Sequence, residues 1–249
     1  MFWLKWAALS AFCTVCIFTF ATPAHSSFRI LFFDLGKTEA SFVSFSNGRN
    51  CLINTGRRYP NDQAFWIVRP FLMASGFRTL DHVLLTSSDS AHAGGLQTLT
   101  KYFQISNLFI APQLSVEKSE ISFGPDSSIE LLAASHGKPL VFQIRQGEVS
   151  ALYFTSTQAK AFELLLKKPV FSYDIVFFPQ HDYGIGDAEE IFLKRTRPRF
   201  IVSNQREGLS ELKAELESIV SSELFFIQNL GAVEFRLLKE GWNWQNFKT

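Results

Sequence analysis

The pattern of hydrophobic and polar positions predicts short strands and helices that follow one another along most of the chain. We expect a strand where a short run is rich in Val, Ile, Leu and Phe, and a helix where apolar residues recur every three or four positions. The expected strands are residues 28–34, 40–46, 50–54, 81–86, 107–111, 129–134, 140–145, 151–155, 173–178, 200–203, 224–228 and 232–238. The expected helices are residues 63–73 (with Pro70 as a point of distortion), 94–102, 159–166, 188–194 and 209–220.

The order of these elements indicates an α/β (α+β) fold with stacked layers. Asn47-Gly48 is a strong hairpin signal, so the first three strands form an antiparallel meander. Later strands alternate with helices, and neither a repeat nor a low-complexity linker interrupts them. We therefore expect residues 27–249 to form one domain in which helices cover two sheets.

The amino-terminal segment has a different pattern from the rest of the chain. Lys5 is followed by a continuous apolar run from Trp6 to Ala21 and then by small residues up to Ala24. The run is shorter than the roughly 20 residues that cross a bilayer comfortably. Residues 1–26 are thus predicted to be a secretory signal peptide or, alternatively, a membrane anchor, which places the protein in the cell envelope.

The amino-acid composition bears on nucleic-acid binding, on the size of the core and on disulfide formation. The chain has 24 Lys and Arg against 23 Asp and Glu, so its net charge lends no support to bulk attraction to nucleic acid. Its 27 Phe residues demand deep apolar layers. Of the 3 Cys, Cys51 is the one that follows the amino-terminal segment, and we expect it to be a buried strand residue.

Polar motifs recur at the ends of several predicted strands. They read FDLGKTEA at 33–40, CLINTG at 51–56, TSSDSAHAGGL at 86–96, FTST at 154–157 and DIVFFPQH at 174–181. In this order they resemble the metallo-β-lactamase superfamily, and most closely the C-terminal hydrolase domain of ComEC-type competence proteins. There the corresponding motifs read FxDVGQGDA, LIDTG, THxDxDHxGGL, LTGD and DVLKVxHH. The resemblance implies a four-layer αββα sandwich and a two-metal hydrolytic site.

This sequence departs from the family at most of the metal-binding positions. A two-metal site needs carboxylate and imidazole ligands, which serine, alanine and threonine side chains do not replace. The positions that the resemblance assigns to the site are Asn54, Ser87, Asp89, Ala91, His92, Thr157, Gln180 and His181. We therefore expect a vestigial site.

Three residues of this set keep ligating chemistry. Asp89, His92 and His181, together with a water, could hold one Zn²⁺ or Mn²⁺ ion. The alternative is that Asp89 caps the loop or the following helix and that His92 belongs to an inherited scaffold. The resemblance implies no organic cofactor.

Three functions follow as hypotheses. The first is a degenerate protein without catalysis that acts as an accessory in an envelope process, which the resemblance suggests is DNA uptake. Its partner would be an envelope protein or nucleic acid. The second is a mononuclear metal-dependent nuclease or phosphodiesterase. The third is a nucleic-acid-binding module in which Arg195, Arg197 and Arg199 contact phosphates.

Overall fold

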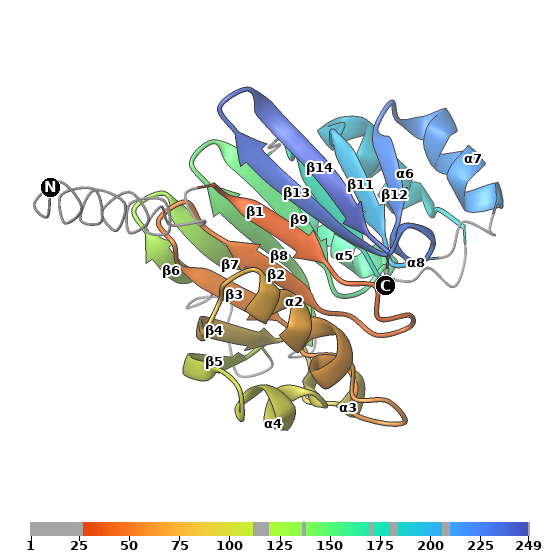
Figure 1. Ribbon diagram of the computed structural model, residues 1–249. Coiled ribbons are helices and arrows are strands. Elements are labelled where there is room, and N and C mark those ends of the chain that lie inside the picture. The colour runs from red at the N-terminus through yellow and green to blue at the C-terminus, as the bar shows by residue number, and fades with distance from the viewer. Residues whose placement is uncertain are drawn as a thin grey trace, which may run out of the picture.

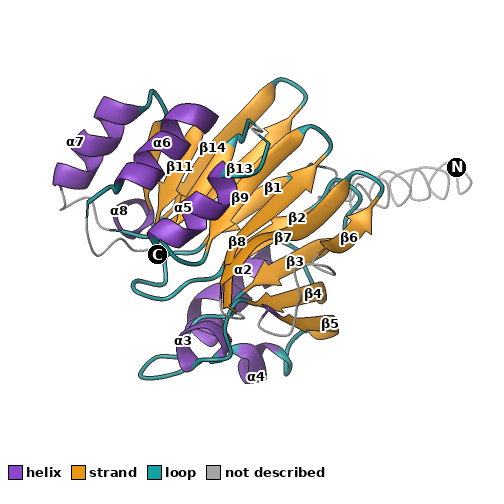
Figure 2. Ribbon diagram, turned by 180° about the vertical axis from the view of Figure 1, so that it is seen from behind, coloured by secondary structure: helices purple, strands orange, loops and turns teal. Residues whose placement is uncertain are grey.

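A computed structural model describes residues 27–111, 120–135, 138–169, 172–179, 184–205 and 210–248. Two seven-stranded sheets lie face to face, with helices on the outer side of each (Figures 1 and 2). The strand orders are β14-β13-β1-β2-β3-β4-β5 and β12-β11-β10-β9-β8-β7-β6. This is the αββα sandwich that the sequence predicted.

The first sheet combines antiparallel and parallel pairs. Its strands are β1 (Arg29–Phe32), β2 (Ser41–Ser44), β3 (Asn50–Ile53), β4 (Thr79–Leu85), β5 (Gln104–Ile110), β13 (Ala232–Leu238) and β14 (Gly241–Phe247). The predicted meander is confirmed, because β2 pairs antiparallel with both β1 and β3. From β3 to β5 the pairing is parallel, so the chain crosses over through helices between these strands.

The second sheet is antiparallel at one side and parallel at the other. Its strands are β6 (Glu120–Gly124), β7 (Ser127–Ser135), β8 (Lys138–Gln146), β9 (Val149–Phe154), β10 (Ile175–Phe178), β11 (Phe200–Ser203) and β12 (Glu223–Phe226). Strands β9 to β12 run parallel to one another. The loops that connect them therefore lie at the two ends of these strands, the amino-terminal and the carboxyl-terminal end.

Helices cover the outer faces of both sheets. They are the π-helix η1 (Ala64–Val68), α2 (Arg69–Ala74), α3 (Ser90–Ala93), α4 (Leu96–Leu99), α5 (Ala159–Leu166), α6 (Asp187–Thr196), α7 (Ser210–Ile219) and α8 (Ile227–Leu230). Pro70 lies in the first turn of α2, where a missing N–H costs nothing, and the helix before it is distorted as expected. Among the described residues, no helix has the length and apolar character that crossing a membrane requires.

Three clusters of buried apolar side chains contain most of the buried phenylalanines. One lies between the sheets, where Phe32 of β1 stacks on Phe177 of β10 with ring centroids 4.9 Å apart. The other two lie between each sheet and its helices. In β10, Ile175 and Phe177 face the partner sheet while Val176 and Phe178 face the helices. Both faces of the strand are buried, so its sequence is apolar without alternation.

Several elements differ from the sequence prediction, and the strand expected over 224–228 ends at Phe226, where α8 follows. The helix expected over 94–102 is wrong in extent, because α3 precedes the two glycines and α4 ends at Leu99. Strands β6 and β14 were not predicted, and β14 is an edge strand that carries Trp242 and Trp244. Cys51 lies in β3 and is fully buried, as expected.

Candidate functional site: a vestigial metal loop

The metal-loop segment, residues 86–96, follows β4 and folds back against the loop after β3. Thr55 donates from its backbone N–H to the His92 carbonyl oxygen at 2.7 Å, and the Gly95 N–H donates to the Gly56 carbonyl at 3.0 Å. The Asn54 side-chain oxygen accepts from the Thr86 N–H at 2.9 Å. The amide oxygen of Asn54 therefore connects the end of β3 to the start of the metal loop.

The ligand-type side chains in this segment bind one another. Asp89 caps α3 by accepting from the backbone N–H groups of Ala91 and His92, so the alternative interpretation of Asp89 as a cap is confirmed. The same oxygen lies 2.7 Å from Nδ1 of His92. The Ser87 hydroxyl donates to the other Asp89 oxygen at 2.7 Å. Both carboxylate oxygens are thus engaged within the loop.

The electrostatics of Asp89 agree with this engagement. Burial opposes its ionisation, but the hydrogen bonds from His92 and Ser87 and the charge of His92 outweigh burial and lower its pKa to about 2. Asp89 is therefore a carboxylate at neutral pH. Its charge is satisfied by neighbours in the loop.

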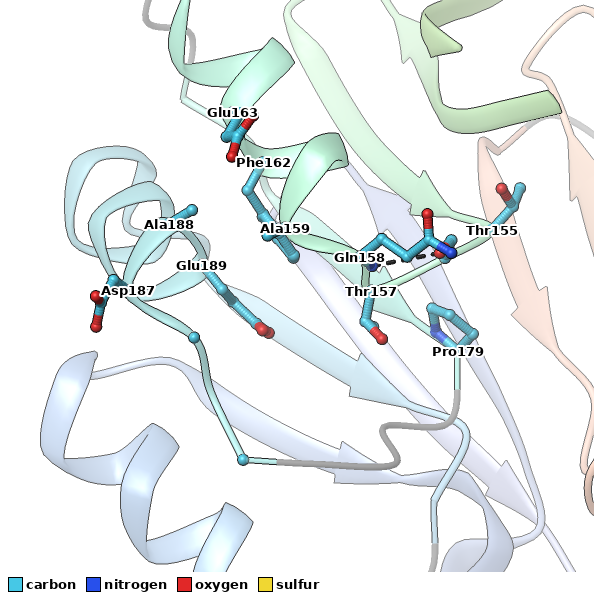
Figure 3. A pocket seen from close by; sticks show the side chains of 13 residues that line it. Thr155, Thr157, Gln158, Ala159, Phe162, Glu163, Pro179, Asp187, Ala188 and Glu189 are labelled. Carbon is cyan, nitrogen blue, oxygen red and sulfur yellow. Dashed lines mark hydrogen bonds between the residues drawn. The ribbon is translucent and has the colours of Figure 1, made fainter. Parts of the chain in front are cut away.

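The other predicted site residues are placed on the second sheet or not described. Thr157 follows β9 and lines a cleft of about 760 Å³ that runs between the starts of α5 and α6. Figure 3 shows Thr157 and Glu189 pointing into this cleft from opposite sides. Gln180 and His181 lie outside the described residues, so the assignment of His181 as a ligand stays a prediction.

The donors present do not fit the two-metal site that the fold implies. Ser87, Ala91 and Thr157 supply no carboxylate or imidazole at three of its positions. Within the described residues, no three His, Cys, Asp or Glu side chains are grouped so as to hold a metal ion. We therefore derive no hydrolytic step through a pair of metal ions.

Sequence reasoning missed a buried acid beside the loop. Glu39, which precedes β2, accepts a hydrogen bond from the Tyr153 hydroxyl at 3.2 Å between the two sheets. Burial raises the pKa of Glu39 to about 7, against the opposing charge of His92 and the hydrogen bond from Tyr153. Burial and the charge of Glu39 also raise the pKa of Tyr153 well above its usual value. The signal in the sequence was the acidic residue of the FDLGKTEA motif at 33–40, close to the start of an apolar strand.

A second missed residue is Gln63, which ties the strand-end loops together. Its side chain donates to the Leu35 carbonyl at 2.7 Å and accepts from the Arg57 N–H at 2.9 Å and from the Thr38 hydroxyl at 2.5 Å. From the other sheet, Asn204 donates to the Thr38 carbonyl at 3.1 Å. The loops around the vestigial site are therefore held by buried amides.

Comparisons with known proteins agree with the fold and give a partial sequence relative. No protein-family model matches the chain. It is 27% identical over 151 residues to ComE operon protein 3 of Bacillus subtilis (strain 168). The matched segment covers 55% of this chain and 19% of that protein. The chain thus spans about a fifth of the length of this curated relative.

Solved structures share the architecture at low sequence identity. A putative metal-dependent hydrolase from Parabacteroides distasonis superimposes with a TM-score of 0.51 at 12% identity, covering 78% of this chain and 90% of that one. A putative Zn-dependent hydrolase of the metallo-β-lactamase superfamily from Thermotoga maritima gives 0.45 at 11% identity, covering 79% and 97%. The chain therefore shares its two-sheet, helix-covered fold with the Parabacteroides distasonis structure and is similar in sequence to part of ComE operon protein 3.

Proposed function

We propose that the protein is a non-catalytic metallo-β-lactamase-fold protein that acts as an accessory in an envelope process related to DNA uptake. One observation carries the proposal: the remaining ligand-type side chains of the metal loop, Asp89 and His92, are bound to each other at 2.7 Å. Asp89 in addition caps α3. A carboxylate that holds its own loop together serves the fold without a metal ion. The similarity to ComE operon protein 3 supports the process.

The test measures metal content and hydrolysis on the full chain. Purified protein is incubated with Zn²⁺ or Mn²⁺, desalted, analysed for bound metal and assayed on single- and double-stranded DNA and on a phosphodiester dye. We expect less than stoichiometric metal and no turnover. Two bound equivalents with turnover would overturn the proposal.

A matched set of variants separates the mononuclear hydrolase from the accessory protein. Each variant removes one of the three predicted ligands: Asp89→Asn, His92→Ala or His181→Ala. If all three variants lose one equivalent of metal together with a measurable hydrolysis rate, the mononuclear enzyme is correct. If metal content is the same in the three variants and the unchanged protein, the accessory role stands.

A specific surface favours nucleic-acid binding as the second candidate. Beside the metal loop, Tyr59 and Trp66 are 77% and 69% exposed. The Arg69 guanidinium lies 3.9 Å from the Phe65 ring centroid and 4.6 Å from that of Tyr102. Aromatic faces alternating with arginines are typical of surfaces on which single-stranded bases stack.

Single-stranded DNA binding to this surface is tested by fluorescence anisotropy with a labelled oligothymidylate at several salt concentrations. Because stacking contributes roughly 1–3 kcal/mol per base, Trp66→Ala should weaken binding by at least about fivefold. Ile191→Ala, which removes a 55% exposed apolar side chain on α6, is the control. Binding without salt dependence, or equal affinity for Trp66→Ala, would exclude this candidate.

The envelope location is also part of the proposal. It follows from the predicted signal or anchor at residues 1–26 and requires that the chain leave the cytoplasm. Expression in cells followed by fractionation and mass spectrometry of the amino terminus tests it. An intact chain recovered in the cytoplasmic fraction would contradict it.

A further inference from the structure

A basic cavity lies at the amino-terminal ends of β11 and β12 in the second sheet, away from the vestigial site. It is bounded by the turns that lead from α6 into β11 and from α7 into β12, and has a volume of about 590 Å³. The two helices lie side by side over this sheet (Figures 1 and 2). At the other end of β11, Asn204 contacts the Thr38 loop near the vestigial site. The cavity is thus separate from that site.

The structure divides the basic run that the sequence singled out. Lys194, Arg197 and Arg199 line the cavity, whereas Arg195 donates to the Leu166 carbonyl at 2.9 Å and lines a different pocket. Lys194 is paired with Glu190. In the part of the chain that the structure describes, neither Arg197 nor Arg199 has a carboxylate partner. The Arg199 guanidinium lies 5.0 Å from the Phe200 ring centroid, and no carboxylate of the described residues competes with a ligand for either arginine.

The backbone at Arg197 is an independent sign that its side chain has a role. Arg197 ends α6 in the left-handed conformation, with φ 46° and ψ 60°, and its N–H donates to the Leu193 carbonyl at 2.9 Å. Helices that end in this way usually have glycine there, because a β-carbon makes the conformation unfavourable. An arginine at this position keeps a strained backbone and presents an exposed guanidinium at the cavity.

The other residues that line the cavity contribute one negative charge and several hydroxyl groups. Glu217 is the single carboxylate among the described lining residues, and both α6 and α7 end here with their carbonyl groups. The three cationic side chains that line the cavity outnumber Glu217, and the negative ends of the two helices offset part of that excess. The hydroxyl of Ser222 donates to the Pro198 carbonyl and that of Ser218 to the Glu215 carbonyl, whereas Ser221 is exposed and has no hydrogen-bond partner among the described residues.

We propose that this cavity binds the phosphate group of a small organic phosphate through Arg197 and Arg199. Two guanidinium groups at one cavity match the paired oxygens of a phosphate. The volume falls within the range of small-molecule sites, roughly 300–1,000 Å³. A concave pocket with two arginines that lack carboxylate partners among the described residues suits a compact ligand rather than a long polyanion. The site does not depend on the proposed accessory function.

The experiment titrates the full chain with thymidine 5′-monophosphate, thymidine and inorganic phosphate, followed by amide NMR shifts. We expect saturable shifts at residues 197–199 and 218–222 with the monophosphate, weaker binding of inorganic phosphate, and none with thymidine. Arg197→Gly and Arg199→Gln should each weaken binding at least tenfold. Arg197→Gly should also leave the melting temperature unchanged or higher, because glycine suits this backbone.

Controls distinguish a built site from diffuse charge. Arg195→Gln removes a neighbouring charge of the same run but should leave affinity within about twofold, since Arg195 faces the Leu166 carbonyl. Equal weakening by Arg195→Gln and Arg197→Gly would overturn the proposal, as would equal binding of thymidine. Binding of anionic phospholipid vesicles or oligonucleotides without saturable binding of the monophosphate would overturn it too. The titration reads neither metal content nor turnover, so its failure leaves the accessory role unaffected.

Discussion

At the residue scale, the polar groups near the vestigial site stabilise the fold in ways that depend on their surroundings. Glu39 and Asp89 are both carboxylates, yet burial raises the pKa of Glu39 to about 7 while hydrogen bonds and the His92 charge, against burial, lower that of Asp89 to about 2. Glu39 lies between the sheets beside Tyr153. Asp89 lies at the surface with its side chain 53% exposed. The two acids therefore respond to pH in opposite directions.

Replacing Glu39 with Gln should stabilise the protein in a pH-dependent way. In the unfolded chain this carboxyl ionises near the ordinary glutamate pKa of 4.5, whereas the folded state holds the proton up to about pH 7. The stability that protonation provides is present below pH 4.5 and is lost as pH rises through 7. Glu39→Gln should thus equal the unchanged protein at pH 4 and exceed it by up to about 3 kcal/mol at pH 8. Urea unfolding at both pH values measures this difference.

Glu163→Gln serves as the control for that pH series. Glu163 is a solvent-exposed carboxylate on α5, with its side chain 52% exposed. Its replacement should change the free energy of unfolding by less than about 0.5 kcal/mol at either pH. A Glu39→Gln effect that is the same at pH 4 and pH 8 would contradict the burial of an ionisable group at this position.

Replacing Asp89 with Ala should destabilise the metal loop. Loss of an N-cap costs about 1 kcal/mol, and His92 and Ser87 lose their partner at the same time. Urea unfolding at pH 7 should therefore show a lower free energy of unfolding for Asp89→Ala. Ser88→Ala, an exposed neighbour, should have no effect larger than about 0.5 kcal/mol. Equal stability of the two variants would show that the cap contributes nothing.

At the element scale, the two glycines of the metal loop, Gly94 and Gly95, allow close packing of this loop on the loop after β3. A β-carbon at Gly94 would lie 2.4 Å from the Ser90 carbonyl oxygen and 2.7 Å from the Arg58 backbone nitrogen. At Gly95 it would lie 2.4 Å from the Thr55 oxygen. The metal loop can approach the loop after β3 only if both residues lack a side chain. Packing alone therefore requires both glycines, and their presence gives no support to catalysis.

Gly95→Ala should lower the free energy of unfolding by about 2 kcal/mol or more, because the clash is with backbone and with the methyl group of Ala64. Gly186→Ala is the matched control, since a β-carbon there meets nothing within 4 Å and φ is −83°. Urea unfolding midpoints of the two variants measure the effect. Similar midpoints for both would mean that the loop relaxes away from β3.

At the scale of the whole molecule, aromatic stacking between the sheets holds the sandwich together. Phe177 stacks on Phe32 of the opposite sheet at 4.9 Å and on Tyr153 of its own sheet at 4.6 Å. Phe177 is 2% exposed, so its ring is enclosed by both sheets. Loss of one such ring leaves a cavity at the centre of the protein.

Phe177→Ala should lower the free energy of unfolding by about 3–5 kcal/mol, a large share of the total stability of a domain. Thermal unfolding followed by circular dichroism checks this expectation. Trp66→Ala, which removes an equally large but 69% exposed side chain, should change stability by less than about 1 kcal/mol. If both variants melt alike, the inter-sheet stack is not a main source of stability.

Local pattern and motif order by themselves determined much of the fold of this protein. The apolar run 173–178 indicated a strand, and the Asn47-Gly48 turn indicated the first hairpin, because both signals depend on neighbouring residues alone. The ordered motifs predicted the αββα sandwich. The edge strand β14 escaped prediction because it is stabilised by pairing with β13, which is a tertiary contact.

The site depended far more on the tertiary structure. The sequence determined which ligand positions had lost their carboxylate or imidazole, because that depends on residue identity. Only the fold decided that Asp89 and His92 bind each other, that Glu39 meets Tyr153 between the sheets, and that Arg197 and Arg199 share a cavity from which Arg195 is turned away. The physical reason is that hydrogen bonds, burial and cavities join residues far apart in the chain, whereas sequence patterns report mainly on near neighbours.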